Sequence, residues 1–520
     1  MNSKTNRQDI RGALGPYAVY LVFSVLTGVI IYFSLMANSL VNNLDGIWHP
    51  SNFIAGDWEI SLGRGLQRYA DRARFGLVSN PWNSLIFFVL FGISDCLIIK
   101  KFKLERTFFS YLFIFISLAN PIVCESLTYS YMSVNFALAF FFAVLSFYFV
   151  PTITDKKITR RIIVRILVPA LSFGVSMAFY QAYICVFAVL SVFSLLAMIK
   201  AGAEIRRTVT KLALFFAVFT IGGLIYFVIT KLLLLRAGVE MASYKGADNI
   251  GLVRILKRFP ESVVLSYQET FGFLVKGKLS ADLEFASVMI WVICAVLIFV
   301  SIMAFIRIIK EEKKHAILFA MLMIIVPAAA SCICIIAVGN GISRLMAMGI
   351  LIGILLFYTI SGEKKYMSWV MNITYILMAW YLVSAVENDQ IALKEGITAT
   401  RNMTENAITE MYTEGLLSKA ECIAFVGRTA ENPLFYKSTA YEMANGYAQF
   451  GRWSTEARNN MVTWIGITET MCGVSLPFCG VETYSKIVQS DEVRQMPIYP
   501  LSGYMKIIDG VLVIKMSDLY

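Results

Sequence analysis

The sequence has few charged residues and almost no histidine. Only 16% of its 520 residues are charged and 58% are hydrophobic, whereas a soluble domain is usually about 25% charged and about 45–50% apolar. This composition excludes a soluble enzyme, a disordered tail and a fibrous protein. The two histidines, His49 and His315, are too few for a histidine-rich metal site or a histidine-based catalytic triad.

Several motifs of known chemistry are also missing. The nine cysteines include no CxxC pair, and the sequence has no Walker phosphate loop, no dinucleotide-binding fingerprint and no carboxylate cluster supported by histidine. The sequence therefore predicts no metal and no cofactor. Cys422, Cys472 and Cys479 lie in the C-terminal tail, and their disulfide pairing stays open because a sequence alone does not determine it.

What the sequence does contain is long apolar runs. Runs of about 18 or more apolar residues with few charges are typical of transmembrane helices. The first run is too long for the apolar part of a cleaved signal peptide, so it is expected to remain as an anchor. The fold class is thus a polytopic α-helical membrane protein of about eleven transmembrane helices. The spans are expected at 15–37, 80–99, 107–123, 133–152, 162–180, 181–199, 212–234, 285–309, 316–337, 345–360 and 366–386.

The distribution of basic residues predicts the orientation, because lysine and arginine accumulate in cytoplasmic loops. They gather in alternate short segments near 100–106, 156–165, 200–211 and 307–314, whereas the turns 124–132 and 180–182 contain none. The N-terminus is therefore expected in the cytoplasm, and an odd number of spans puts the C-terminus outside. The net charge of +11 is attributed to orientation and anionic lipid rather than to a nucleic-acid partner.

Three regions on the exterior side are large enough to carry function. They are the outer loops 38–79 and 235–284 and the tail 387–520. The tail is expected to alternate helices and strands: a polar helix over 388–418, the apolar strand Cys422–Val426, a helix near 454–471 and a final pair of elements around Tyr504–Lys515. The chain is therefore divided into a membrane domain, 1–386, and a C-terminal extracytoplasmic α/β domain, 387–520.

The first outer loop carries the residues best suited to chemistry. Three acids, Asp45, Asp57 and Glu59, follow the first span. Arg64 lies between Gly63 and Gly65, where backbone can approach a ligand closely, and a guanidinium binds phosphate through two parallel hydrogen bonds. An acid beside such an arginine suits sugar transfer from a polyprenyl phosphate, because the acid deprotonates an acceptor hydroxyl while the arginine holds the leaving phosphate.

The same loop predicts an amphipathic helix at the membrane interface. Arg64, Arg68 and Arg72 are spaced at i, i+4 and i+8, which puts three guanidinium groups on one helical face at headgroup level. Arg68, Arg72 and Arg74 are interpreted as anchors to anionic lipid.

Two further charges belong to the outer face. Glu125 precedes Tyr129 and Tyr131 in the turn that begins at Asn120-Pro121, and it is either a solvated acid or a substrate ligand. Arg344 is the one charge of its outer turn, and it is either a snorkelling anchor or a phosphate contact.

These residues resemble the GtrII-like glucosyltransferases, bacterial membrane enzymes within the broader group of polyprenyl-phosphate-sugar-dependent (GT-C type) glycosyltransferases. The resemblance extends over the whole chain in a series of patches. They are Asp45, Trp58 with Gly63-Arg64, Asn120-Pro121 with Glu125, Tyr180-Gln181-Ala182, Phe425-Val426-Gly427, and Tyr499-Pro500 with Gly503.

The resemblance implies an enzyme of the bacterial plasma (inner) membrane. Such an enzyme takes a sugar, often glucose, from undecaprenyl phosphate on the outer leaflet and attaches it with inversion to a surface glycan, such as O-antigen, another polysaccharide or a teichoic-acid-like acceptor. Family members use a carboxylate of the first outer loop as base, and Asp45 matches that place best. Because they often have two adjacent acids there, whereas Gly46 follows Asp45 here, Asp57 and Glu59 stay open as the base.

The resemblance also implies roles for residues other than the three candidate bases. Arg64 and Arg344 are expected to bind the donor phosphate. Glu125, Tyr180 and Gln181 are expected to contact the sugar or the acceptor.

Two other functions stay open. A flippase or transporter of lipid-linked glycans would place ionisable residues or helix breaks in mid-span, but Asp95, Arg165, Lys231 and Arg307 all lie near span ends. A partner in the assembly of envelope polysaccharide would tolerate the loss of Asp45 and Arg64.

Overall fold

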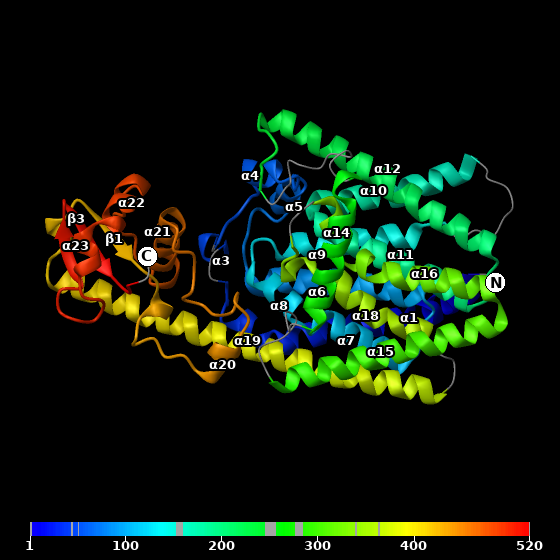
Figure 1. Cartoon of the computed structure of the whole chain (residues 1–520). Coiled ribbons are helices and arrows are strands. Elements are labelled where there is room, and N and C mark those ends of the chain that lie inside the picture. The colour runs from blue at the N-terminus through cyan, green and yellow to red at the C-terminus, as the bar shows by residue number, and fades with distance from the viewer. Residues whose placement is uncertain are drawn as a thin grey trace.

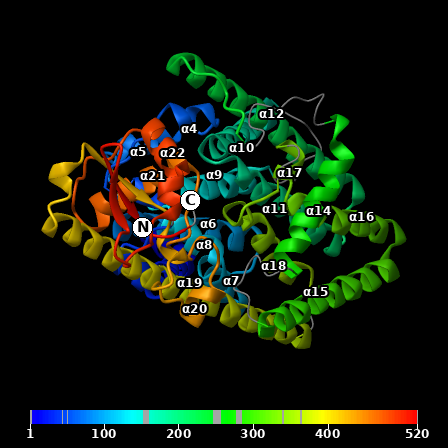
Figure 2. The same cartoon turned by 60° about the vertical axis from the view of Figure 1, so that its left-hand side comes forward.

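The computed structural model describes residues 3–42, 45–49, 51–151, 160–244, 256–275, 284–337, 341–361 and 365–518. These residues form a bundle of helices with a small sheet at one end. Figure 1 shows the N-terminus at the end of the bundle remote from the sheet, and Figure 2 shows how the bundle helices lie side by side.

Apolar helices coincide with every predicted span. Six described helices are long and apolar enough to cross a membrane, and the bent pair α7–α8 brings this number to as many as seven. Four shorter apolar helices cover the remaining predicted spans, at Gly15–Ile31, Ser133–Phe149, Arg165–Phe179 and Met348–Ile360. The structure thus supports a helical membrane protein, and the count of eleven spans stays a prediction.

The bundle is made of the following described helices: α1 (Ser3–Ile31), α2 (Phe33–Ala37), α6 (Asn80–Lys101), α7 (Phe108–Leu118), α8 (Pro121–Thr128), α9 (Ser133–Phe149), α10 (Arg160–Phe179), α11 (Ile184–Lys200), α12 (Ile205–Ala237), α15 (Glu284–Glu311), α16 (Lys313–Ala330), α17 (Ile333–Ile336), α18 (Met348–Ile360) and the first half of α19 (Lys365–Thr413).

The Asn-Pro turn divides one predicted span into α7 and α8, which meet at an angle of 41°. Pro121 lacks an N–H and so begins a new helix at little cost. The Asn120 side chain accepts hydrogen bonds from the backbone N–H groups of Ile122 and Val123, at 3.0 and 3.1 Å, and caps that helix. The bend carries Glu125 and Tyr129 toward the end of the bundle where the first outer loop lies.

The first outer loop folds into three short helices, α3 (Asp45–Trp48), α4 (Asp57–Ser61) and α5 (Gln67–Ala73). The sequence predicted a single helix that carries Arg64, Arg68 and Arg72. This prediction is wrong for Arg64, because α5 begins only at Gln67. Arg64 lies in the turn between α4 and α5, where Gly63 has a positive φ of 74°.

Arg74 is not a lipid anchor as predicted, because it forms a buried ion pair. Its Nη2 lies 2.6 Å from Oδ1 of Asp71, and the two side chains are 11% and 0% exposed. Arg74 also donates to Asn83 of α6, and Asp71 accepts from Asn135 of α9 and from the backbone N–H of Ala55. These bonds fasten the loop to two bundle helices, which sequence spacing alone did not reveal.

Helix α19 has 49 residues and connects the bundle to the sheet (Figure 1). Gln390 fixes it at the break between α1 and α2, where its amide accepts from the N–H of Leu35 and donates to the carbonyl of Ile31, at 3.0 and 2.9 Å. The helix runs continuously through the predicted domain boundary at 386/387, and the division into two domains stays a prediction.

The tail forms a three-stranded sheet of order β1-β3-β2. Strand β1 (Cys422–Val426) is parallel to β3 (Val511–Lys515), and β2 (Met505–Ile508) is antiparallel to β3. The strands and the helix near 454–471 lie where the sequence predicted them. All nine cysteines are free thiols, and Cys422 and Cys479 are hydrogen-bonded neighbours. The helices of the tail are α20 (Thr439–Met443), α21 (Ala457–Gly466), α22 (Val481–Gln489) and α23 (Asp491–Gln495).

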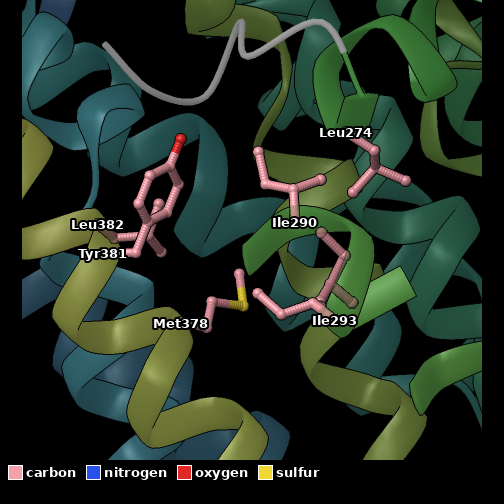
Figure 3. Close-up of a pocket in the computed structure, with 7 residues that line it drawn as sticks. Leu274, Ile290, Ile293, Met378, Tyr381 and Leu382 are labelled. Atoms are coloured by element: carbon pink, nitrogen blue, oxygen red, sulfur yellow. The ribbon is translucent and has the colours of Figure 1, made fainter. Parts of the chain in front are cut away.

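Part of the second outer loop, 245–255 and 276–283, lies outside the described residues. Between these segments, α14 (Phe259–Val275) packs against α16, where Thr270 donates to the carbonyl of Pro327. A small cavity of about 20 Å³ lies between α14, α15, α18 and α19, and Figure 3 shows residues that line it. Its lining is nearly all hydrocarbon, so it is a packing gap without chemical function. The lining residues are Leu274, Ile290, Ile293, Ile354, Met378, Tyr381 and Leu382.

We predict that Arg74→Ala destabilises the protein strongly, because it leaves the carboxylate of Asp71 buried without its cation, at a cost of about 3–5 kcal/mol. Thermal unfolding of the purified protein in detergent measures the effect. The double variant Asp71→Asn/Arg74→Ala should recover part of the loss.

Arg494→Ala is the matched control, because the Arg494–Asp491 pair is 59% and 87% exposed. An equal loss of stability in both arginine variants would contradict the role given to the Asp71–Arg74 pair.

Candidate functional site

A cleft of about 670 Å³ has a lining that is both polar and aromatic. It lies where the first outer loop meets α8, the N-terminal end of α9, the C-terminal end of α10 and the tail helix α21. Its volume is typical of small-molecule sites, which span roughly 300–1,000 Å³. It is lined by Asp45, Trp48, His49, Trp58, Glu59, Leu62, Arg64, Glu125, Tyr129, Tyr131, Met132, Phe136, Tyr180, Tyr244, Ser343, Leu345, Met346, Arg458, Asn459 and Val462.

Of the three candidate bases, Asp45 and Glu59 line this cleft. Asp45 is the first residue of α3. Glu59 lies on α4, where its Oε2 accepts a hydrogen bond of 2.7 Å from the N–H of Gly56. Asp57 is not among the lining residues, and its exposed carboxylate lies 2.8 Å from the guanidinium of Arg68. Among the residues that the structure describes, no three histidine, cysteine or acidic side chains are grouped to hold a metal.

Arg64 projects into the cleft from the turn after α4. Its guanidinium lies over the ring of Tyr180, 4.6 Å from the centroid, and its Nε donates to Oε1 of Gln181 at 3.5 Å. A cation above an aromatic face is held electrostatically while its remaining N–H groups stay directed to a ligand. The structure therefore brings Arg64 together with Tyr180 and Gln181, which follow it in the sequence by 116 and 117 residues.

Gln181 joins this arginine to two other elements. Its Nε2 donates to the carbonyl of Leu62 at 2.7 Å and to the hydroxyl of Tyr226 on α12 at 2.9 Å. Gly63 is required beside it, because a Cβ there would lie 2.3 Å from the Tyr226 hydroxyl and 3.0 Å from Gln181 Nε2. Gln181 thus acts mainly as a support for the turn that presents Arg64.

Arg344 is not among the residues that line the cleft, although its neighbours Ser343 and Leu345 are, and its guanidinium is held by several groups. Its Nη1 lies 3.5 Å from Oε2 of Glu125, with side chains 15% and 11% exposed. Its Nη2 donates to Oδ1 of Asn445, and its guanidinium lies 5.4 Å from the ring centroid of Tyr447. Buried Asp389 in turn accepts from Asn445 and Tyr447. The pair Arg344–Glu125 therefore links α8 to α19 and the tail.

Aromatic side chains supply much of the cleft wall. The rings of Trp58 and Tyr244 meet edge to face at 5.7 Å, and His49 packs against Tyr131 at 4.7 Å. Aromatic faces of this kind provide apolar surface against which the C–H faces of a sugar ring can pack, while their polar atoms remain available for its hydroxyls.

The two outer tyrosines remain protonated donors. Burial, and then the carboxylates of Glu125 and Asp45, raise the pKa of Tyr129. Burial, and then the carboxylate of Asp45, raise the pKa of Tyr131. Asp45 thus acts electrostatically on both phenols. Burial also lowers the pKa of His49 and favours its neutral ring.

The tail contributes residues that the sequence did not indicate. Arg458, Asn459 and Val462 of α21 line the cleft. Helix α21 packs on α3, where a Cβ on Gly466 would lie 2.5 Å from Cγ2 of Ile47 (Figure 1). More than 400 residues separate the two helices, and neither has a motif that pairs them. The tail thus forms one wall of the cleft that contains Asp45.

A second, almost wholly apolar cavity of about 80 Å³ adjoins the cleft. Five residues line both spaces: Leu62, Arg64, Tyr180, Tyr244 and Met346. Arg64 therefore lies at a boundary between a polar, aromatic cleft and a space suited to hydrocarbon. The other lining residues of the apolar cavity are Met177, Gln181, Ala182, Ile333, Ile336 and Ala337.

One comparison with known proteins gives a match. A family model described as Glucosyl transferase GtrII matches residues 39–360. No curated protein and no solved structure matches the chain. The matched range includes the first outer loop, Glu125, Tyr180, Gln181 and Arg344, whereas Arg458 and Asn459 lie beyond it.

We predict that His49 titrates below its ordinary pKa of 6.5, because burial penalises its cation. The stability that the neutral ring provides is present above the pKa of the unfolded chain and is lost as the pH falls through the lower folded pKa. NMR of ¹³C-labelled histidine should give two signals, and His315→Gln assigns them. A His49 signal that titrates at 6.5 or above would contradict the prediction.

We also predict that Gly63→Ala lowers the melting temperature, because the new Cβ displaces Tyr226 or Gln181 at the support of Arg64. Gly238→Ala is the matched control: its φ of 67° carries the same backbone strain, but nothing lies within 4 Å of its Cβ position. The backbone strain costs about 1–2 kcal/mol in each variant. The difference in thermal unfolding between the two variants therefore measures the clash alone. Equal losses would argue against the proposed support.

Proposed function

The chain belongs to the glucosyl transferase GtrII family, and from this premise we propose that it transfers a sugar, with glucose the first candidate, from undecaprenyl phosphate to a cell-surface glycan. The reaction takes place at the outer face of a bacterial plasma membrane, with the N-terminus in the cytoplasm and residues 387–520 outside. The acceptor is a surface polysaccharide such as O-antigen or a teichoic-acid-like polymer.

The observation that carries this proposal is the place of Arg64 between two different cavities. A lipid-linked sugar has an apolar chain, a single phosphate and a polar ring, in that order. Arg64 suits the phosphate, the 670 Å³ cleft suits the sugar ring, and the apolar cavity suits the first part of the polyprenyl chain. A single guanidinium can neutralise one phosphate without a metal.

We assign the role of general base to Asp45. It deprotonates the acceptor hydroxyl as that oxygen attacks C1 of the sugar, and the bond from C1 to the phosphate oxygen breaks. Undecaprenyl phosphate leaves with its charge compensated by Arg64. Attack on the face opposite the leaving group inverts the configuration at C1.

The other carboxylates are less suited to this role. Glu59 lines the cleft but caps its own helix through the N–H of Gly56, and Asp57 pairs with Arg68 outside the cleft lining. Glu125 is paired with Arg344. We therefore rank Glu59 second and Asp57 third as the base, and we keep Arg344 as the second candidate for the donor phosphate.

The acceptor would approach from the side of the tail. Arg458 and Asn459 line the cleft on that side, together with the aromatic wall and Tyr180. Their polar groups, with Glu125 and the protonated phenols of Tyr129 and Tyr131, suit the hydroxyl groups of a glycan.

The test measures the release of labelled glucose from undecaprenyl phosphate by the purified protein, with crude envelope glycan as acceptor. We predict that Asp45→Asn reduces transfer by about 10²–10⁴-fold while donor binding is retained, because the isosteric amide removes the proton acceptor and little else. Asp57→Asn is the matched control and should keep most of the activity.

Transfer that survives in Asp45→Asn but is lost in Glu59→Gln would move the base to Glu59. Absence of transfer by the wild-type protein with every lipid-linked sugar tried, together with movement of the intact lipid-linked glycan across vesicles, would favour the flippase instead.

A further inference from the structure

Behind the turn that presents Arg64 lies another, smaller cavity of about 120 Å³. Arg68 and Arg72 of α5 and Arg236 at the end of α12 line it. We propose that this arginine pocket binds the phosphate of an anionic lipid in the outer leaflet. The remaining lining residues are Ile60, Gly65, Tyr69, Leu233 and Ala237.

The pocket exists because α5 begins against the end of α12. Gly65 permits this approach, since a Cβ there would lie 2.6 Å from Cδ1 of Leu233. Arg68 and Arg72 are four residues apart on α5 and so share one face of the helix. This face is turned to Arg236, which adds a third guanidinium from a different element.

The pocket carries an excess of positive charge. Arg68 forms an ion pair with Asp57 at 2.8 Å. Within the described ranges, neither Arg72 nor Arg236 forms an ion pair with an acidic side chain. Three guanidinium groups with one carboxylate leave a net charge of +2 around a space that is polar and small. Guanidinium groups bind phosphate oxygens in pairs, so a phosphate group matches both the charge and the size.

The surroundings indicate a lipid rather than a soluble phosphate. Leu232 and Leu235, in the same turn of α12 as Arg236, are 61% and 71% exposed. Phe75, which follows α5, is 81% exposed. Such apolar side chains are covered by acyl chains when a helix lies in a bilayer, and the predicted span 212–234 ends two residues before Arg236. The arginines therefore lie at headgroup depth, where each strengthens the attraction of anionic lipid.

The arginine pocket is separate from the cleft, and the two share no lining residue. The turn between α4 and α5 lies between them: Glu59 and Arg64 line the cleft, whereas Ile60 and Gly65 line the arginine pocket. A lipid phosphate held by Arg72 and Arg236 would thus join α5 to α12 and steady that turn. This inference does not depend on the transfer reaction.

The test is lipid retention by the full-length protein in neutral detergent, measured by native mass spectrometry during titration with phosphatidylglycerol. We expect Arg72→Gln/Arg236→Gln to weaken retention by about tenfold or more, and Arg72→Lys/Arg236→Lys to weaken it less. Lys257→Gln/Arg258→Gln is the matched control, because it removes the same charge from exposed positions of another outer segment. It should change retention by less than about twofold.

Two further ligands distinguish the sources of the phosphate. Phosphatidylcholine, whose headgroup is neutral, and glycerol 3-phosphate, which lacks acyl chains, should both bind more weakly than phosphatidylglycerol. Equal losses in the pocket and control variants would mean general surface attraction and would overturn the site. Equal binding of glycerol 3-phosphate would overturn the assignment to a lipid. Thermal unfolding of each variant verifies that it is folded.

Discussion

The buried ion pair between Asp71 and Arg74 is the interaction on which the arrangement of the first outer loop depends. It fastens the end of α5 to Asn83 of α6 and Asn135 of α9. Because the first outer loop is fixed at this end, the turn from α4 to α5 has a defined position above the bundle. This position puts Arg64 in the cleft, and it puts Arg68 and Arg72 in the arginine pocket.

The turn from α4 to α5 presents Arg64, the residue proposed to bind the donor phosphate. Tyr180 lies beneath its guanidinium and Gln181 supports it from the junction between α10 and α11. A cation at the boundary between an apolar cavity and a polar cleft is the feature that a lipid-linked sugar donor requires. Asp45 and the tail helix α21 line the same cleft, so the groups proposed as base, phosphate ligand and acceptor contacts all lie around one space.

Sequence reasoning predicted the apolar helices, the strand Cys422–Val426 and the unusual surroundings of Arg64, because hydropathy and glycine placement act locally. It misread Arg74, whose partners on α6 and α9 come close only after folding. It also missed Arg458 and Asn459, since the packing of α21 on α3 depends on shape at Gly466 and Ile47, which leaves no pattern in sequence. Hydropathy therefore could not reveal contacts between segments that lie far apart in the sequence.

The most direct test of the account is a cryo-electron-microscopy structure of the Asp45→Asn protein with undecaprenyl-phosphate-linked glucose in a lipid nanodisc. The account predicts phosphate density within hydrogen-bonding distance of the Arg64 guanidinium, with the sugar in the cleft and the first isoprene units in the adjoining apolar cavity. Donor phosphate bound at Arg68, Arg72 and Arg236 with its sugar outside the cleft would contradict the account.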